Sequence, residues 1–308
     1  MINEVRIKKF NLNSAKKIFN KLSNFYNEKD VISWKRNVSE QINNLFTKYQ
    51  VVDYKLNKNS YMGIVIWCQC LENKEIYIKF VPPFIERFNT EIGTLKLLPK
   101  KLICQIYEIN YEFCFFVMEK IAPGNLVDFD GNEKLYKKLF DELYKNRMIV
   151  DENDGRFKNF NEVVAKDYNI LKKYIKVDQK TKELYIKFTK IYNKLCNNNS
   201  VYLLHGDVYK NNVVSFNDTI KIIDPLGFKA PFVMELVSIC AYEMLYSKKS
   251  NIKILNKYVD FFSCYVNEKT YKDALFCQLV KVYIPSIYEA NDGGKRATKW
   301  LSIINDLY

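Results

Sequence analysis

The segment from His205 to Asp224 holds the polar side chains whose types and spacing point most directly to chemistry. Asp207 and Asn212 are five residues apart, and Asp224 follows a later apolar run. Between Asn212 and Asp224, two β-rich runs flank a short polar turn, which is the pattern of a hairpin. Because a hairpin brings its two ends together, we expect Asn212 and Asp224 to be neighbours.

An amide oxygen beside a carboxylate forms a pair of hard oxygen ligands suited to Mg²⁺. Asp207, on the preceding loop, would be placed to accept a proton from an incoming hydroxyl group. Metal ligands that neutralise phosphates, together with a base that orients the nucleophile, are the parts that phosphoryl transfer needs. Each residue taken singly is more simply a turn or strand-end residue, but all three in this order favour phosphoryl transfer.

The pattern H-G-D-x-x-x-x-N, followed by a strand ending in I-D-P, resembles the catalytic and metal-binding segments of the aminoglycoside phosphotransferase family. That family has a protein-kinase-like fold. Residues 224–227, 231–235 and 288–294 are similar to its branch of streptomycin 6-phosphotransferases and hydroxyurea kinases. The resemblance runs from about residue 50 to the C-terminus and is most specific over residues 204–235.

By position, the resemblance implies that Asp207 is the catalytic base and that Asn212 and Asp224 are the Mg²⁺ ligands. His205 would brace the loop through a hydrogen bond rather than take part in the reaction. The expected phosphoryl donor is ATP, with GTP left open. A serine hydrolase does not fit, because the sequence contains no G-x-S-x-G motif.

A kinase of this type also needs a lysine that binds the nucleotide phosphates and a helix glutamate that positions it. Lys79 lies in an otherwise apolar strand, where a lysine is costly without a partner, and Glu91 lies on the next expected helix. We expect an ion pair between them, although Lys79 could instead point outward from an edge strand. The adenine would bond backbone groups near Glu119 and Ile121, and Ser60 would cover the phosphates from a loop poor in glycine.

The order of elements predicts an α+β chain with two lobes, and the family resemblance implies that these lobes form a protein-kinase-like fold. The expected N-terminal nucleotide-binding lobe spans residues 1–120 and opens with a helical preface over residues 1–50. Residues 121–308 form the expected helical C-terminal lobe, which carries the catalytic loop and the acceptor site. Period-two and helical patterns predict a helix over residues 86–98 and strands over 61–67, 76–81, 102–109 and 113–118.

The composition of the chain argues against several classes of protein. The eight cysteines form no C-x-x-C pair and there is one histidine, so a zinc site is excluded and the cysteines are expected to be reduced. The N-terminus is too polar for a signal peptide, and no apolar run could cross a bilayer, so a cytoplasmic monomer or dimer is expected. The net charge of +13 is spread along the chain without a nucleic-acid-binding motif, so no specific nucleic acid partner is predicted.

The acceptor is harder to predict than the reaction. An aminoglycoside such as streptomycin is the first candidate, for antibiotic resistance, and a choline- or homoserine-type metabolite is the alternative. A catalytically silent pseudokinase and a basic RNA-binding module are two further classes. Acidic residues expected to line an acceptor pocket, each also readable as a solvated surface group, are Asp151, Glu235, Glu289 and Asp292.

Overall fold

The computed structural model describes residues 7–23, 26–57, 60, 63–151, 154–288 and 294–308. The chain forms two compact units, and neither is continuous in sequence. The first comprises the residues up to 92 with 100–125 and 215–221, and the second comprises 93–99, 126–214 and 222–308. With the exception of residues 93–99 and 215–221, the first unit ends at Asn125 and the second begins at Leu126. However, helix α3 (Phe88–Leu97) and the late hairpin contribute to both units.

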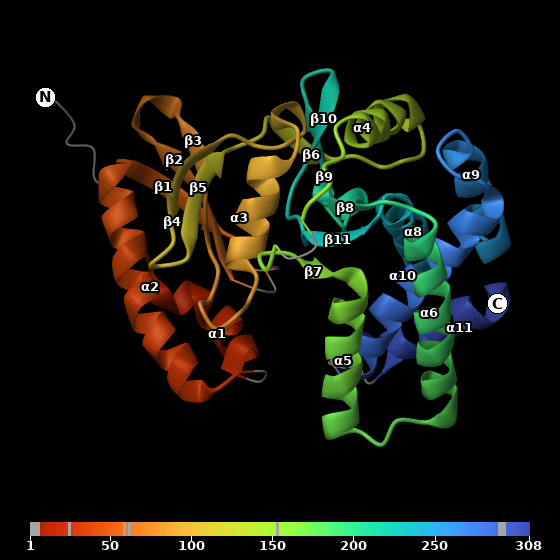
Figure 1. Ribbon diagram of the computed structural model, residues 1–308. Helices are drawn as coiled ribbons and strands as arrows, with labels where there is room; N and C mark the ends of the chain where they lie inside the picture. Colours follow the sequence, from red (N-terminus) through yellow and green to blue (C-terminus); the bar gives the residue numbers. More distant parts are fainter. Residues whose placement is uncertain (1–6, 24–25, 58–59, 61–62, 152–153, 289–293) are drawn as a thin grey trace, which may run out of the picture. The chain divides into compact units, whose positions relative to one another are not determined.

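The first unit is built on a five-stranded sheet in the order β1-β2-β3-β5-β4, with every neighbouring pair antiparallel (Figure 1). The predicted strands are present with shifted ends, and β1 is an additional strand. The strands are β1 (Val51–Leu56), β2 (Ile64–Cys70), β3 (Glu75–Phe80), β4 (Ile106–Asn110) and β5 (Phe115–Glu119).

The predicted helical preface is present and packs against the sheet as η1 (Leu12–Ala15), α1 (Lys16–Ser23) and α2 (Glu28–Lys48). Strand β2 buries every second residue, which is the alternation of a strand with one face on a core. Its buried side chains join those of α2 in one apolar cluster that includes Trp34, Ile42, Phe46, Ile64, Ile66 and Cys68. The sheet therefore has one covered face, and alternate residues of its strands point to the other face.

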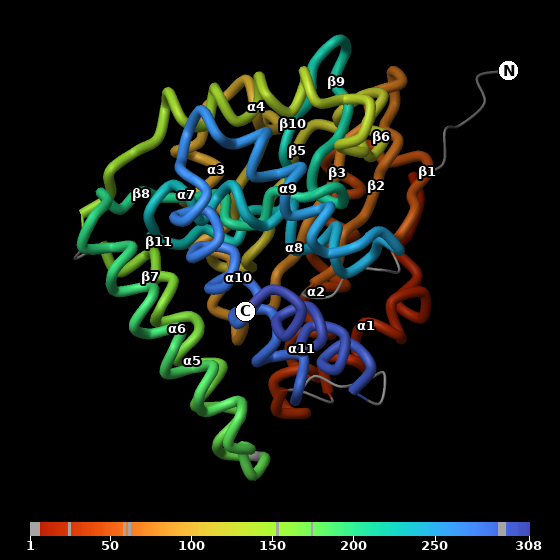
Figure 2. The backbone as a smooth tube through the Cα atoms, turned by 90° about the vertical axis from the view of Figure 1, so that its right-hand side faces the viewer, coloured from red at the N-terminus to blue at the C-terminus, as the bar shows by residue number. Residues whose placement is uncertain are grey.

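The second unit is mainly helical, as predicted. Helix α10 is almost entirely buried and packs against α5, α6, α7, α8 and α11, and α5 and α6 run beside each other as a long hairpin (Figure 2). In the part of the chain that the structure describes, no helix is long and apolar enough to cross a membrane. The helices are α4 (Glu133–Lys145), α5 (Phe160–Tyr174), α6 (Gln179–Asn197), α7 (Val233–Leu236), α8 (Ser238–Tyr246), α9 (Asn251–Phe262), α10 (Glu268–Tyr288) and α11 (Lys295–Leu307).

Two small sheets hold the segment that carries the predicted chemistry. The predicted hairpin is formed by β9 (Val213–Phe216) and β10 (Thr219–Ile222). Strand β6 (Pro123–Leu126) pairs with β9 as the third strand of this sheet. The second sheet was not predicted and consists of β7 (Lys158–Asn159), β8 (Val201–Leu204) and β11 (Phe228–Pro231). Strand β8 leads into His205, and β11 begins shortly after Asp224.

Candidate active site

The loop that carries Asp207 is tied at its start to the segment that follows Asp224. Leu204, the last residue of β8, pairs with Phe228, the first residue of β11. The carbonyl oxygen of His205 then accepts hydrogen bonds from the N–H groups of Leu226 at 2.9 Å and Gly227 at 3.2 Å. These backbone bonds place two segments that are distant in sequence beside each other.

Gly206 meets a steric requirement of this loop. Its φ is +79°, and a Cβ atom built on it would lie 2.4 Å from the ring of Phe228. A residue with a side chain would be disfavoured both by the backbone conformation and by the ring. Glycine therefore lets the loop pass close to β11 and present Asp207.

The side chains of Asp207 and Asn212 are in direct contact. The amide nitrogen Nδ2 of Asn212 donates to the carboxylate Oδ2 of Asp207 and to its main-chain oxygen, both at 2.9 Å. Asn212 is buried, whereas Asp207 is partly accessible. With its N–H groups directed at Asp207, the amide has its oxygen left to bind a cation.

Asp224 is brought to Asn212 by the feet of the hairpin, as predicted. The N–H of Ile223 donates to the carbonyl oxygen of Asn212 at 3.0 Å. Asp224 follows directly, with a φ of +60°, a left-handed conformation that aspartate tolerates better than most residues. The backbone of Asn212 is therefore close to that of Asp224, and their amide oxygen and carboxylate are ligand types that fit Mg²⁺, which is usually held by one or two protein groups together with water and phosphates.

His205 braces this arrangement, as predicted. Its ring nitrogen Nε2 lies 3.0 Å from the carbonyl oxygen of Ile223, and its Nδ1 lies 3.3 Å from the N–H of Asp207. A carbonyl oxygen can only accept, so Nε2 carries the proton and Nδ1 is the acceptor of a neutral imidazole. The ring therefore links the loop of Asp207 to the residue before Asp224.

Glu235 has a different role from the one predicted. It was expected to line an acceptor pocket, but the residue is only 1% exposed. Its carboxylate oxygens accept hydrogen bonds from the backbone N–H groups of His205 at 2.7 Å and Gly206 at 2.9 Å. Burial raises the pKa of Glu235 to about 7, against the opposing effect of these two hydrogen bonds. Glu235 thus holds the two residues immediately before Asp207.

The predicted ion pair of the first unit is present. Lys79 Nζ lies 2.6 Å from Glu91 Oε1, and the two side chains are 10% and 2% exposed. Lys79 lies in β3 between Val65 of β2 and Phe116 of β5, so it is not on an edge strand. The opposite face of β3 carries Ile78 in the apolar core, which leaves Lys79 on the face that meets α3.

The other predicted nucleotide-binding positions also belong to the first unit. Glu119 ends β5, and its N–H is donated to the carbonyl of Gln105, so a base bound there would have to use the Glu119 carbonyl. The Glu119 side chain pairs with Lys221 at 2.5 Å. Ile121 is buried. Ser60 closes a turn on Asn57, but several residues around it lie outside the described part of the chain.

Of the four acidic residues predicted for the acceptor site, only Glu235 and Asp151 lie in the described part of the chain. Asp151 is exposed and contacts Lys229 through its main-chain oxygen. Glu289 and Asp292 lie outside the described residues. Among the described residues, no group of three or more His, Cys, Asp or Glu side chains is arranged to hold a metal ion.

A pocket of about 400 Å³ in the second unit lies beside Asp207 and was not predicted. The rings of Tyr209 and Tyr242 form one of its walls, stacked with centroids 3.9 Å apart. Burial raises the pKa of Tyr209 to about 12, and the nearby carboxylates of Asp207 and Asp224 contribute to the rise. Tyr209 follows Asp207 by two residues in the chain, so this wall of the pocket lies next to the predicted base. The only sequence signal for it was the i, i+4 spacing of Tyr242 and Tyr246 on one helix.

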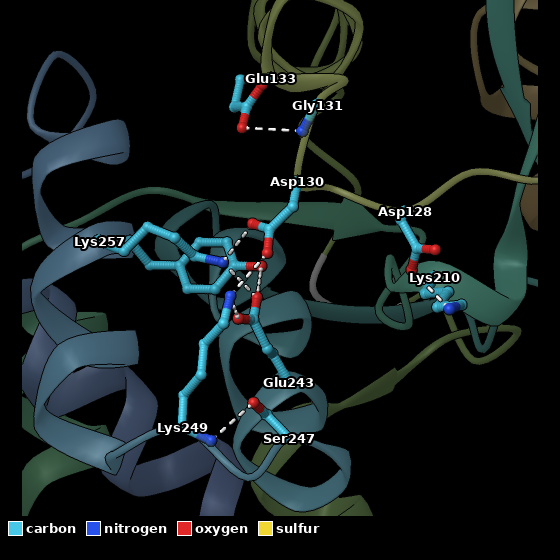
Figure 3. Close-up of polar contacts among 10 residues, drawn as sticks. Asp128, Asp130, Gly131, Glu133, Lys210, Glu243, Ser247, Lys249 and Lys257 are labelled. Carbon is cyan, nitrogen blue, oxygen red and sulfur yellow. Dashed lines mark hydrogen bonds and ion pairs between the residues drawn. The ribbon is translucent and has the colours of Figure 1, made fainter.

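Charged side chains also line this pocket, and Figure 3 shows the contacts among them and Lys257. Asp130, from the loop before α4, contacts Lys249 at 2.7 Å and Lys257 at 3.0 Å. Glu243, on α8, contacts Lys257 at 2.5 Å and accepts a hydrogen bond from the hydroxyl group of Tyr258 at 2.6 Å. The network therefore joins α8, α9 and the loop before α4.

Comparisons with known proteins give matches in structure. No family model and no curated protein sequence matches this chain. A choline kinase from Streptococcus pneumoniae has a TM-score of 0.67 at 15% identity, over 89% of this chain and 98% of its own. A Plasmodium vivax ethanolamine kinase has a TM-score of 0.64 at 12% identity, over 99% and 97%.

An aminoglycoside phosphotransferase in complex with ADP and hygromycin B has a TM-score of 0.60 at 9% identity, over 85% of this chain and 97% of its own. The chain has a kinase-like fold. The predicted α+β, bilobal class is thereby confirmed. Sequence identities this low establish the fold alone, so evidence for an activity has to come from the chain's own residues.

Proposed function

We propose that the chain is an ATP-dependent small-molecule kinase that transfers the γ-phosphoryl group to an acceptor hydroxyl. The observation that carries the proposal is the contact of Asn212 with Asp207 at 2.9 Å, on a hairpin whose feet bring Asp224 to Asn212. The same fold in kinases named for choline, ethanolamine and aminoglycosides supports it. This combination favours an active kinase over a pseudokinase, which would lack one of these side chains.

In the proposed reaction, Asp207 accepts the proton of the acceptor hydroxyl while the acceptor oxygen bonds to the γ-phosphorus. The bond from that phosphorus to the β–γ bridging oxygen breaks, and ADP leaves. The Asn212 amide holds the Asp207 carboxylate through Oδ2, so the base is oriented before the acceptor arrives. Lys79, positioned by Glu91, would bind the nucleotide phosphates, and Glu119 and Ile121 would bind the base through their backbone.

Asn212 and Asp224 would hold Mg²⁺. When bound, the ion would neutralise charge on the transferred phosphoryl group. The chain's own contribution is to keep two oxygen ligands adjacent, through the Ile223 to Asn212 backbone bond at 3.0 Å and the His205 contact with Ile223.

The acceptor predicted first is an aminoglycoside of the streptomycin type, which would make the chain an antibiotic-resistance enzyme. One observation favours the second candidate, a smaller hydroxylated metabolite. The carboxylates of the tyrosine-lined pocket are all engaged by lysines of the same unit, whereas an aminoglycoside needs carboxylates to bind its ammonium groups.

The decisive experiment is a coupled assay of Mg²⁺-ATP consumption over aminoglycosides, amino alcohols and sugars, with Asp207→Asn as the test variant. For the acceptor found, Asp207→Asn should lower kcat by about 10²- to 10⁴-fold, because the base is lost. ATP binding, measured by thermal shift, should be retained. Asp218→Asn, in the exposed turn of the same hairpin, removes the same charge and should leave kcat unchanged. Normal turnover by Asp207→Asn would refute the assignment of the base.

A further inference from the structure

The tyrosine-lined pocket beside Asp207 has aromatic rings in its lining and carboxylates that are paired with lysines. Its aromatic lining comes from Phe129, Tyr136, Tyr209, Tyr242, Tyr246 and Tyr258. The rings of Tyr209, Tyr242 and Tyr246 form a continuous stack, with the second pair 6.3 Å apart and nearly parallel. Such faces contact flat or apolar ligand surfaces well.

Each of the three carboxylates that line this pocket is paired with a lysine of the same unit. Asp128 contacts Lys210 at 2.5 Å. Asp130 is contacted by both Lys249 and Lys257. Three carboxylates therefore face three ammonium groups, because Glu243 is also contacted by Lys249 and Lys257 (Figure 3).

The two shared lysines differ in how firmly they are held. Lys257 is 28% exposed and lies over the rings of Phe129 and Tyr258, at 5.0 and 4.5 Å from their centroids. Lys249 is 56% exposed and comes from the short connection between α8 and α9. Lys257 is thus packed against two aromatic residues of the pocket lining, whereas Lys249, which itself lines the pocket, is more exposed.

A positively charged ligand would gain little in this pocket. To reach Asp130 or Glu243 it would have to displace a lysine that is already attached to the same chain, and the whole chain carries a net charge of +13. A neutral alcohol meets no such competition, and its apolar part can stack on the tyrosine rings.

We propose that Lys249 and Lys257 are specificity-determining residues that make the acceptor pocket electrically neutral, so that it takes an alcohol without a positive charge. The inference rests on the proposed function and deepens it, because it concerns the acceptor of the same reaction. It assigns the acceptor to uncharged hydroxylated compounds with an apolar or ring face, rather than to aminoglycosides or quaternary ammonium alcohols.

Two alcohols of nearly the same shape test the proposal. Choline carries a quaternary nitrogen where 3,3-dimethylbutan-1-ol carries a carbon, so the pair differs mainly in charge. Wild type should phosphorylate the neutral alcohol with a kcat/KM at least equal to that for choline. In Lys249→Met, the ratio of choline to neutral alcohol should rise about fivefold through KM, because a partly exposed charge of the network is removed. A wild-type preference for choline of tenfold or more would overturn the proposal.

Lys248→Met is the matched control, because Lys248 is the exposed neighbour of Lys249 and lies outside the pocket lining. It removes the same charge and should leave the ratio unchanged. An equal rise in both variants would mean that overall charge, rather than the pocket network, sets the preference, and would overturn the proposal.

A binding measurement separates failure of this inference from failure of the kinase proposal. Calorimetric titration with streptomycin requires no turnover. Weak binding by wild type, strengthened in Lys249→Met but not in Lys248→Met, supports the neutral pocket even if no alcohol is phosphorylated. Tight binding of streptomycin by wild type that Lys249→Met does not change would overturn the inference and leave the kinase proposal intact.

Discussion

Glu235 is a buried carboxylate whose described partners are two backbone N–H groups of the loop that carries Asp207. Burial outweighs these bonds and raises its pKa from 4.5 to about 7. Between these two pH values the folded chain keeps a proton that the unfolded chain has lost. The contribution of Glu235 to stability is therefore present below about pH 4.5 and falls as the pH rises to 7, by about 3 kcal/mol.

Urea unfolding of wild type and Glu235→Gln across this range tests the prediction. Glutamine does not titrate, so the variant should not lose this stability. As the pH rises from 4.5 to 7, the free energy of unfolding of wild type should fall relative to that of the variant by about 3 kcal/mol. Parallel curves for the two proteins would show that Glu235 has an ordinary pKa.

Residue types alone were enough to predict some contacts of the site. Lys79 in an apolar strand required a carboxylate partner, and Glu91 was the acidic residue at a suitable distance on the next helix. Glu235 was misassigned because an acidic residue after a metal-ligand segment gives no sign of whether it faces a pocket or a backbone. The lysines of the tyrosine-lined pocket could not be found either, since they are distant in sequence from Asp130 and this lysine-rich chain offers many partners.

At the scale of elements, the turn at Gly206 decides how closely the catalytic loop approaches β11. Gly206→Ala would place a Cβ 2.4 Å from the Phe228 ring in a backbone conformation of positive φ. Gly131→Ala is a matched control, because Gly131 also has a positive φ, +85°, but nothing lies within 4 Å of its Cβ position. Chemical denaturation should show a loss of about 1 kcal/mol for Gly131→Ala and at least twice that for Gly206→Ala. Equal losses would mean that the ring moves aside without cost.

Elements with clear periodicity were predicted, and those without it were missed. The alternation in β2 and the paired runs of the late hairpin correctly indicated strands. Strands β8 and β11 have four residues each, and β11 is buried throughout, so neither alternates over a length that distinguishes a strand from a helix. The extent of the two units could not be predicted from one boundary in the sequence either. Helix α3 and the hairpin each lie partly in one unit and partly in the other.

The charge of the whole molecule separates the kinase proposal from the RNA-binding alternative. A net charge of +13 will attract any polyanion, but it is spread along the chain and is not gathered in a nucleic-acid-binding motif. Binding to a random-sequence RNA should therefore be weak and should fall by about tenfold or more between 50 and 200 mM salt, because it depends on counterion release.

Phosphorylation of an uncharged acceptor should respond much less to salt, since the acceptor carries no charge to be screened. Fluorescence anisotropy of labelled RNA and the coupled kinase assay, run over the same salt series, measure the two responses side by side. Tight RNA binding that persists at 200 mM salt would instead indicate specific contacts and would favour the nucleic-acid partner that the dispersed charge argues against.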